Sequence, residues 1–269
     1  MSSSDLAMDD FAQATRGVLA RAGFAAPGVG EACVLVVDSS MLAMHAPVAE
    51  RLLDVDERRR AARFHFEHDR SVYLLAHALW RAVLGICLGV DAAAVPLVRM
   101  PSGQPQLPGT PLATSLSHSG NWVAIAVGHA ATVGVDIECA PARIELGDLL
   151  ATICTPAEAA DMQKLPMPAR EAALLALWTR KEALLKAFGT GLLESPSTLS
   201  AATSALVAAP STSAYPPCRV RGLDLPAELA GAFAAPIAVG LCRLYMPTGA
   251  GARTMPAMEA GMGGSPSSP

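Results

Sequence analysis

The sequence is poor in aromatic residues and in charge. Of its 269 residues, 4% are aromatic, 16% are charged and 52% are hydrophobic. The 20 basic and 24 acidic residues give a net charge of −4. Because a general nucleic-acid-binding protein is expected to be basic and to offer rings for base stacking, this composition argues against one. High hydrophobicity combined with low charge also excludes a chain that is disordered as a whole.

A clean membrane-spanning segment and a secretory signal are also missing. Residues 101–135 carry no charged side chain, but several prolines, His118 and Asn121 interrupt the run, and a spanning helix needs about 20 apolar residues. Acidic Asp5, Asp9 and Asp10 stand where a signal peptide would be basic. The six cysteines form no C-x-x-C pair, which is typical of reduced thiols in the cytosol. We therefore expect a cytoplasmic protein that does not enter the membrane.

The order of apolar runs predicts strands that alternate with helices. Residues 33–38, 122–127 and 133–138 read as strands, and residues 64–88 and 169–188 as long helices. Strands joined by short turns favour an α+β fold over a doubly wound parallel sheet. We expect two similar halves, residues 32–130 and 131–245, each a small, mostly antiparallel sheet with packed helices. Residues 1–31 are predicted to be a flexible extension and residues 246–269 a disordered tail, both dispensable for catalysis.

Two carboxylates alternate with apolar residues in the segment Gly134-Val135-Asp136-Ile137-Glu138. Because alternate residues of a strand share a face, Asp136 and Glu138 are expected to lie side by side. They repel each other unless a positive group lies between them. The alternative is a solvent-facing edge strand whose two acids have no function.

A second motif lies in the predicted helix 169–188. Steps of four residues place Trp178, Glu182 and Lys186 along one helical face. A surface helix with a Glu182–Lys186 ion pair is the simpler interpretation. It does not account for the tryptophan, or for Gly189 and Gly191 directly after the helix.

A third motif, Ser117-His118-Ser119-Gly120, ends another predicted strand. A lone histidine at such a place is more often a structural residue than a functional one. The sequence contains no G-x-S-x-G, so a serine hydrolase is not indicated. It contains no G-x-x-x-x-G-K-[ST] either, which excludes a P-loop enzyme.

In this order and at this spacing, the three motifs resemble those of the 4′-phosphopantetheinyl transferases. The segments are SHS (117–119), GVDIE (134–138) and WTRKEALLKAFGTGL (178–192), and the resemblance covers about residues 60–192. It is closer to the monomeric, surfactin-synthetase-activating type with a W/KEA motif than to the small trimeric synthases. It implies two similar α+β halves with coenzyme A and magnesium between them. It also implies transfer of 4′-phosphopantetheine from coenzyme A to a serine of an acyl or peptidyl carrier protein, with release of 3′,5′-ADP.

The resemblance also implies roles for individual residues. Asp136, Glu138 and Glu182 are expected to hold Mg²⁺, which prefers oxygen ligands. Glu182 and Lys186 are the expected catalytic residues, as general base and as diphosphate contact. The residues expected to bind coenzyme A are Arg60, Arg63, Arg70, Gly103, Gln104, Pro105, Ser117, His118 and Lys186.

Some features and alternatives remain open at this stage. Gln104 stands where the family usually has a lysine, and Arg99 is a candidate for the missing charge. The run Arg58-Arg59-Arg60 would equally suit a solvated helix face. The protein could be a catalytically silent coenzyme A-binding regulator on the same fold, although such a protein would be expected to lose some of the acids. An unrelated magnesium-dependent nucleotide enzyme is the third hypothesis.

Overall fold

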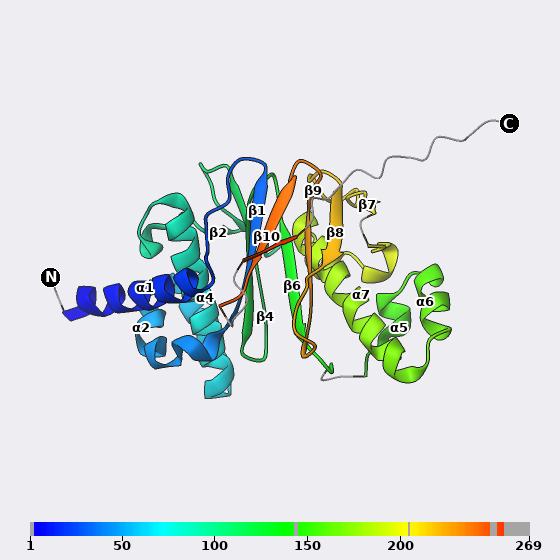
Figure 1. Ribbon diagram of the computed structural model, residues 1–269, viewed down its shortest axis with the longest axis horizontal. Coiled ribbons are helices and arrows are strands. Elements are labelled where there is room, and N and C mark those ends of the chain that lie inside the picture. Colours follow the sequence, from blue (N-terminus) through cyan, green and yellow to red (C-terminus); the bar gives the residue numbers. More distant parts are fainter. Residues whose placement is uncertain (1–2, 143–144, 204, 248–251, 256–269) are drawn as a thin grey trace.

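The computed structural model describes residues 3–142, 145–203, 205–247 and 252–255. Two sheets stand face to face, with α1, α2 and α4 outside one sheet and α5, α6 and α7 outside the other (Figure 1). The helices are α1 (Ser3–Arg21), α2 (Ala46–Ala49), α3 (Val55–Ala61), α4 (Glu67–Leu88), α5 (Leu150–Ile153), α6 (Pro156–Gln163) and α7 (Met167–Phe188). The strands are β1 (Glu31–Asp38), β2 (Val98–Arg99), β3 (Pro105–Gln106), β4 (Leu112–Ser119), β5 (Trp122–His129), β6 (Gly134–Cys139), β7 (Leu206–Val207), β8 (Cys218–Gly222), β9 (Leu229–Pro236), β10 (Leu241–Tyr245) and β11 (Ala252–Met255).

The two halves repeat one arrangement of strand, long helix and two strands. In the first half β1, α4, β4 and β5 give the sheet order β1-β5-β4; in the second half β6, α7, β8 and β9 give the order β6-β9-β8. Neighbouring strands within each of these sets are antiparallel. The predicted α+β fold with mostly antiparallel sheets and packed helices is confirmed.

Alternation along β1 supplies two different cores. Cys33, Leu35 and Val37 pack toward α1 and α4, whereas Ala32, Val34 and Val36 pack between the two sheets. The second sheet contributes Val135 and Ile137 to the core between the sheets, and its other face packs on α7. Because β1 is buried on both faces, it reads in the sequence as a continuous apolar run.

The C-terminal part of the chain departs from the predicted boundaries. Strand β10 leaves the second half and pairs in parallel with β1 in the first sheet. Residues 252–255, predicted to belong to a disordered tail, form β11 and pair with β10. The rest of the predicted tail lies outside the described residues, apart from Met246 and Pro247. The first sheet is therefore completed by chain from beyond the second half.

The N-terminal segment was predicted to be a flexible extension, and this is wrong for α1. Phe11, Val18 and Leu19 are each at most 4% exposed and belong to the core beside α4. Val18 follows Phe11 by seven residues and Leu19 comes next, so the three side chains lie on one side of the helix. The Ser-, Asp- and Ala-rich composition around them conceals this pattern.

Replacing Phe11 by alanine is expected to lower the free energy of unfolding by about 3 kcal/mol, because a buried phenylalanine leaves a cavity. Urea denaturation measures this loss. Phe66→Ala is the matched control, since Phe66 is 73% exposed and surface changes usually stay within about 0.5 kcal/mol. Equal stability of the two variants would contradict the packing of α1.

Helix α4 is long enough and apolar enough to cross a membrane, judged by its length and composition alone. Within the fold, 78% of the most apolar stretch of this helix is buried, and the helix packs in the core against α1, α2 and the first sheet.

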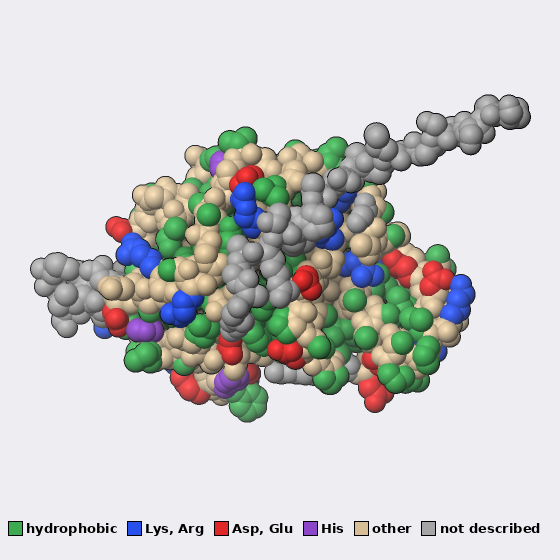
Figure 2. All heavy atoms as spheres, viewed as in Figure 1, with side chains coloured by type: hydrophobic (Ala, Val, Ile, Leu, Met, Phe, Trp, Pro, Cys, Tyr) green, Lys and Arg blue, Asp and Glu red, His purple; other side chains and the backbone are tan. Residues whose placement is uncertain are grey.

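The six cysteines are free, and burial raises the pKa of Cys87, Cys218 and Cys242 to about 12. On the face shown in Figure 2, basic and acidic side chains are interspersed.

Candidate active site

Strand β6 and helix α7 approach so closely that only glycine fits at one contact. A Cβ on Gly134 would lie 1.9 Å from the carbonyl oxygen of Ala183. Glycine at this position lets the two backbones touch. The contact brings the acids of β6 next to Glu182 and Lys186, as the spacing of the two motifs requires.

Asp136 lies at the centre of this contact between β6 and α7. Its side chain is almost fully buried, with the residue 4% exposed, so the alternative of a solvent-facing edge strand is wrong here. Lys186 Nζ lies 2.7 Å from Asp136 Oδ1 and 3.1 Å from the carbonyl oxygen of Val135. The other carboxylate oxygen, Asp136 Oδ2, is buried and has no hydrogen-bond partner among the described residues.

The neighbouring acids influence the ionisation of Glu182 and Glu138. Burial, followed by the charges of Asp136 and Glu138, raises the pKa of Glu182 to about 7, although Lys186 opposes the shift. Burial, together with the charge of Asp136, also raises the pKa of Glu138, and the hydrogen bond from Ser119 opposes this shift.

The lysine next to Glu182 does not belong to this cluster. Lys181 is fully buried, and its Nζ contacts Glu158 Oε2 and, at 2.9 Å, the carbonyl oxygen of Pro196. Glu158 also forms a capping box with Thr155 at the start of α6. Lys181 therefore ties α7 to α6, which is a structural role.

The three predicted metal ligands lie close together but do not form a closed set around one point. In the described part of the chain, no three His, Cys, Asp or Glu side chains are already gathered around one point. Two buried carboxylate oxygens of these three acids nevertheless have no hydrogen-bond partner among the described residues, Asp136 Oδ2 and Glu182 Oε1. Buried carboxylate oxygens without partners, close to other acids, are what a hard cation would satisfy, so this donor set fits Mg²⁺.

A cavity of about 430 Å³ opens beside Lys186, with walls from both halves. Seven of the nine residues predicted to bind coenzyme A line it: Arg60, Gly103, Gln104, Pro105, Ser117, His118 and Lys186. The structure does not bring Arg63 and Arg70 into this cavity. Arg63 is exposed outside its wall, and the Arg70 guanidinium lies 3.2 Å from Glu50.

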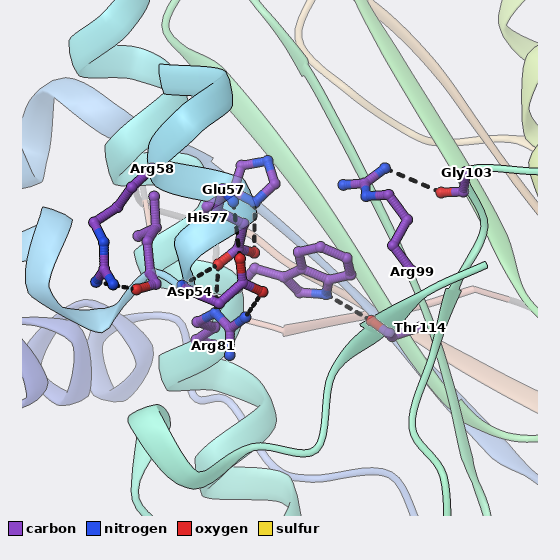
Figure 3. Close-up of polar contacts among 10 residues, drawn as sticks. Asp54, Glu57, Arg58, His77, Arg81, Arg99, Gly103 and Thr114 are labelled. Carbon is purple, nitrogen blue, oxygen red and sulfur yellow. Dashed lines mark hydrogen bonds and ion pairs between the residues drawn. The ribbon is translucent and has the colours of Figure 1, made fainter. Parts of the chain in front are cut away.

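Positive charge gathers at the wall supplied by the first half. Arg60 and Arg99 both line the cavity and an adjoining one of about 490 Å³. Burial and the nearby charge of Arg60 lower the pKa of Arg99, whose Nη1 donates to the carbonyl oxygen of Gly103 at 3.0 Å (Figure 3). Burial, His77 and Lys186 lower the pKa of His118, which disfavours a positive charge on its ring. The two arginines are therefore the cations that this wall offers to an anion.

Gln104 packs against the C-terminal end of α7. Its Nε2 lies 3.4 Å from Thr132 Oγ1 and 3.5 Å from the carbonyl oxygen of Lys186. Gly189, which ends α7 with φ +68°, has no Cβ, and a Cβ there would lie 2.3 Å from Gln104 Oε1. The amide thus links the two halves but adds no charge to the cavity.

Sequence reasoning missed one part of the cavity wall. Tyr73, His77 and Trp80 on α4 line it, and the Tyr73 and His77 rings stack with centroids 4.1 Å apart. His77 Nδ1 lies 2.9 Å from Glu57 Oε1, and Arg81 Nε donates to Glu57 Oε2 at 2.8 Å (Figure 3). The signal was present: Tyr73, His77 and Arg81 recur every four residues on an otherwise apolar helix.

Two family models match neighbouring parts of the chain. The "4'-phosphopantetheinyl transferase, N-terminal" model matches residues 44–130, and the "4'-phosphopantetheinyl transferase superfamily" model matches residues 132–215. The "4'-phosphopantetheinyl transferase HetI" of Nostoc sp. is 33% identical over 145 residues, covering 52% of this chain and 61% of that protein. A "4'-phosphopantetheinyl transferase" of Bacillus subtilis is 28% identical over 142 residues, covering 52% and 62%.

The aligned region thus spans about six-tenths of the length of these two curated relatives. The two family models concern the same kind of protein, and their matches follow one another directly along the chain. The first match holds the arginine-lined wall of the cavity, and the second holds the acids and Lys186. The chain belongs to the 4'-phosphopantetheinyl transferase superfamily.

Proposed function

We propose that the protein transfers 4′-phosphopantetheine from coenzyme A to a serine of an acyl or peptidyl carrier protein, in a magnesium-dependent reaction that releases 3′,5′-ADP. The observation that carries this proposal is one cavity with cations from both halves, Arg60 and Arg99 from the first and Lys186 from the second. Coenzyme A carries a 3′-phosphate and a separate diphosphate. Two cationic regions in one cavity suit that charge distribution.

The residues also suit the chemistry of this transfer. The serine oxygen forms a bond to the phosphorus that carries the pantetheine arm, and the bond from that phosphorus to the bridging oxygen breaks. Glu182 accepts the serine proton as the general base. The electron pair of the broken bond stays on 3′,5′-ADP, where the Lys186 ammonium stabilises the negative charge. Mg²⁺ held by Asp136, Glu138 and Glu182 would neutralise the diphosphate.

We further infer the monomeric, surfactin-synthetase-activating type with a W/KEA motif, working in the cytoplasm. The support is the segment WTRKEALLKAFGTGL together with a site to which both halves of one chain contribute. A second subunit is not needed to complete such a site. Sedimentation that found an obligate trimer would contradict this.

The activity is tested by mass spectrometry of an apo carrier protein incubated with the protein, coenzyme A and Mg²⁺. Addition of one phosphopantetheinyl group to the carrier is the expected result. A catalytically silent regulator would bind coenzyme A and leave the carrier unchanged. That alternative is not favoured, because all three acids and Lys186 are present.

Removing magnesium with excess chelator is expected to abolish transfer and to weaken coenzyme A binding about tenfold, which lies in the usual range of coupling between two ligands. The reason is repulsion between the unneutralised diphosphate and the acids of β6 and α7. Calorimetric titration of coenzyme A with and without chelator measures the effect. Unchanged turnover in chelator would contradict the role of the metal.

Arg99→Ala is expected to weaken coenzyme A binding about tenfold or more, because a hydrogen bond from a charged group to a phosphate is lost. Adding Gln104→Lys in the same chain is expected to restore part of the affinity by returning a cation to the cavity. Arg59→Ala is the control, since Arg59 lies outside the cavity and is 72% exposed. Wild-type affinity in Arg99→Ala would show that Arg99 does not supply the charge missing at Gln104.

A further inference from the structure

Strands β4 and β6 belong to different sheets but are joined side by side through serine hydroxyls. Three alternate serines of β4 accept hydrogen bonds from backbone N–H groups of β6: Ser115 from Val135 at 3.1 Å, Ser117 from Ile137 at 3.4 Å and Ser119 from Cys139 at 3.1 Å. Each pair is 20 residues apart, so the strands run parallel with a fixed register. We call this contact the serine seam.

Two of the three serines also donate a hydrogen bond from their own hydroxyl group to a carboxylate. Ser117 Oγ donates to Asp136 Oδ1 at 2.7 Å, and Ser119 Oγ donates to Glu138 Oε2 at 2.7 Å. Bonds of this length to a carboxylate belong to the strong, charge-assisted class. At the equivalent place opposite Ser115 stands Gly134, which has no side chain. Ser115 therefore joins the strands without holding an acid.

The seam decides which carboxylate oxygen of Asp136 is engaged. Its Oδ1 receives both the Ser117 hydroxyl and the Lys186 ammonium, while Oδ2 stays buried and unpartnered among the described residues. Since the Ser117 oxygen is itself held by the N–H of Ile137, the hydroxyl cannot turn without losing a bond. The direction of the free oxygen is thereby fixed through the backbone.

We propose that Ser117 and Ser119 are positioning residues that hold Asp136 and Glu138 for the divalent cation, across the boundary between the two halves. This inference rests on the proposed function. Ser117 is only 8% exposed, and its hydroxyl is already committed to two bonds. The hydroxyl therefore acts through Asp136.

Ser115 provides a comparison within the same strand. If the serines only join the two sheets, then replacing any of the three by alanine should have the same consequences. If Ser117 and Ser119 also position acids, their replacement should impair metal binding, whereas Ser115→Ala should impair stability alone. Hydrogen-bond partners of metal ligands typically contribute about 10- to 100-fold to metal affinity or activity.

The experiment titrates Mg²⁺ by calorimetry into each alanine variant saturated with coenzyme A, with no carrier protein present. Urea denaturation is measured alongside. We expect similar losses of stability in all three variants, and Mg²⁺ affinity lower by about tenfold or more only in Ser117→Ala and Ser119→Ala. Ser119→Thr keeps a hydroxyl on a half-buried side chain, and it should bind Mg²⁺ nearly as well as the wild type.

Equal Mg²⁺ affinity in the three alanine variants would overturn the positioning role, while transfer by the wild type would leave the proposed function standing. A wild type that neither binds Mg²⁺ nor modifies a carrier would overturn both. If Ser117→Ala does not fold, the inference is tested by comparing the Mg²⁺ affinity of Ser119→Ala with that of Ser119→Thr. Loss of affinity in the first with recovery in the second supports the inference, and equal affinity contradicts it.

Discussion

Glu182→Gln is expected to lower kcat at least about 100-fold and to weaken coenzyme A binding by no more than about tenfold. Glutamine keeps the shape and one oxygen of the side chain but removes its charge and its basicity. A positioned general base contributes about 10²- to 10⁴-fold to rate. The proposed contacts of coenzyme A with Arg60, Arg99 and Lys186 do not depend on that basicity. Steady-state kinetics with an apo carrier and separate titration of coenzyme A measure the two effects.

The pH dependence of activity provides an independent test of the role of Glu182. As the proposed general base, Glu182 would accept a proton only when ionised, so activity is expected to rise with pH as this group deprotonates. Its pKa of about 7 applies to the metal-free protein. Because a bound cation lowers this pKa, the rise in activity is expected below neutrality. Glu182→Gln should lose this limb of the profile.

Glu171→Gln, earlier on the same helix and away from the cavity, is the matched control and should retain both rate and profile. Near-normal turnover in Glu182→Gln would show that Glu182 is neither the base nor a metal ligand. A general loss in both variants would indicate damage to α7 instead.

Periodicity explains why much of the site could be predicted from the sequence. Asp136 and Glu138 share a face because a strand alternates, and Trp178, Glu182 and Lys186 share one because a helix repeats nearly every four residues. The serine seam could not be predicted in this way. It joins strands of different sheets, and no local pattern records which side chain faces a backbone N–H in another sheet. The return of β10 to β1 is hidden for the same reason.

The segment before Arg60 shows a second limit of prediction from the sequence. A run of arginines suggests a solvated helix face, and Arg58, Arg59 and Arg60 are indeed exposed. Glu57, immediately before them, is only 6% exposed and faces α4. A charge on the buried side of an exposed helix becomes apparent only when its partners on another helix are known.

Those partners make Glu57 the centre of a buried ionic network beside the cavity. Glu57 accepts hydrogen bonds from His77 and Arg81, and Arg81 Nη2 also lies 2.7 Å from Asp54 Oδ2 (Figure 3). Both His77 and Arg81 are 3% exposed. Burial alone would raise the pKa of Glu57, but the bonds from His77 and Arg81 outweigh it and lower the pKa from 4.5 to about 2.

Glu57→Gln is therefore expected to lower the free energy of unfolding by about 3 kcal/mol at pH 7. Each pH unit by which folding lowers a pKa is worth about 1.4 kcal/mol, and the fall to about 2 gives this figure. Leaving the buried Arg81 without its main partner leads to the same magnitude. The midpoint of thermal unfolding should fall by roughly 10 °C for a chain of this size.

The dependence on pH separates the ionic network from simple packing. Because folding lowers the pKa of Glu57, its contribution is complete above pH 4.5 and is lost as the pH falls from 4.5 toward 2. The difference between the wild type and Glu57→Gln should therefore be largest near neutrality and shrink in acid. Urea denaturation at pH 7, 5 and 3 measures it. A packing defect would give a difference that does not change with pH.

Asp56→Asn provides the matched control on the same helix. Asp56 pairs with Arg59 at 3.2 Å, but both side chains are more than 70% exposed, and such pairs are worth at most about 1 kcal/mol. Equal stability of the two variants would show that the buried network contributes nothing. Since His77 lines the cavity beside Lys186 and Asp56 does not, Glu57→Gln should weaken coenzyme A binding more than Asp56→Asn does. A stability loss without any change in coenzyme A affinity would separate the network from the site.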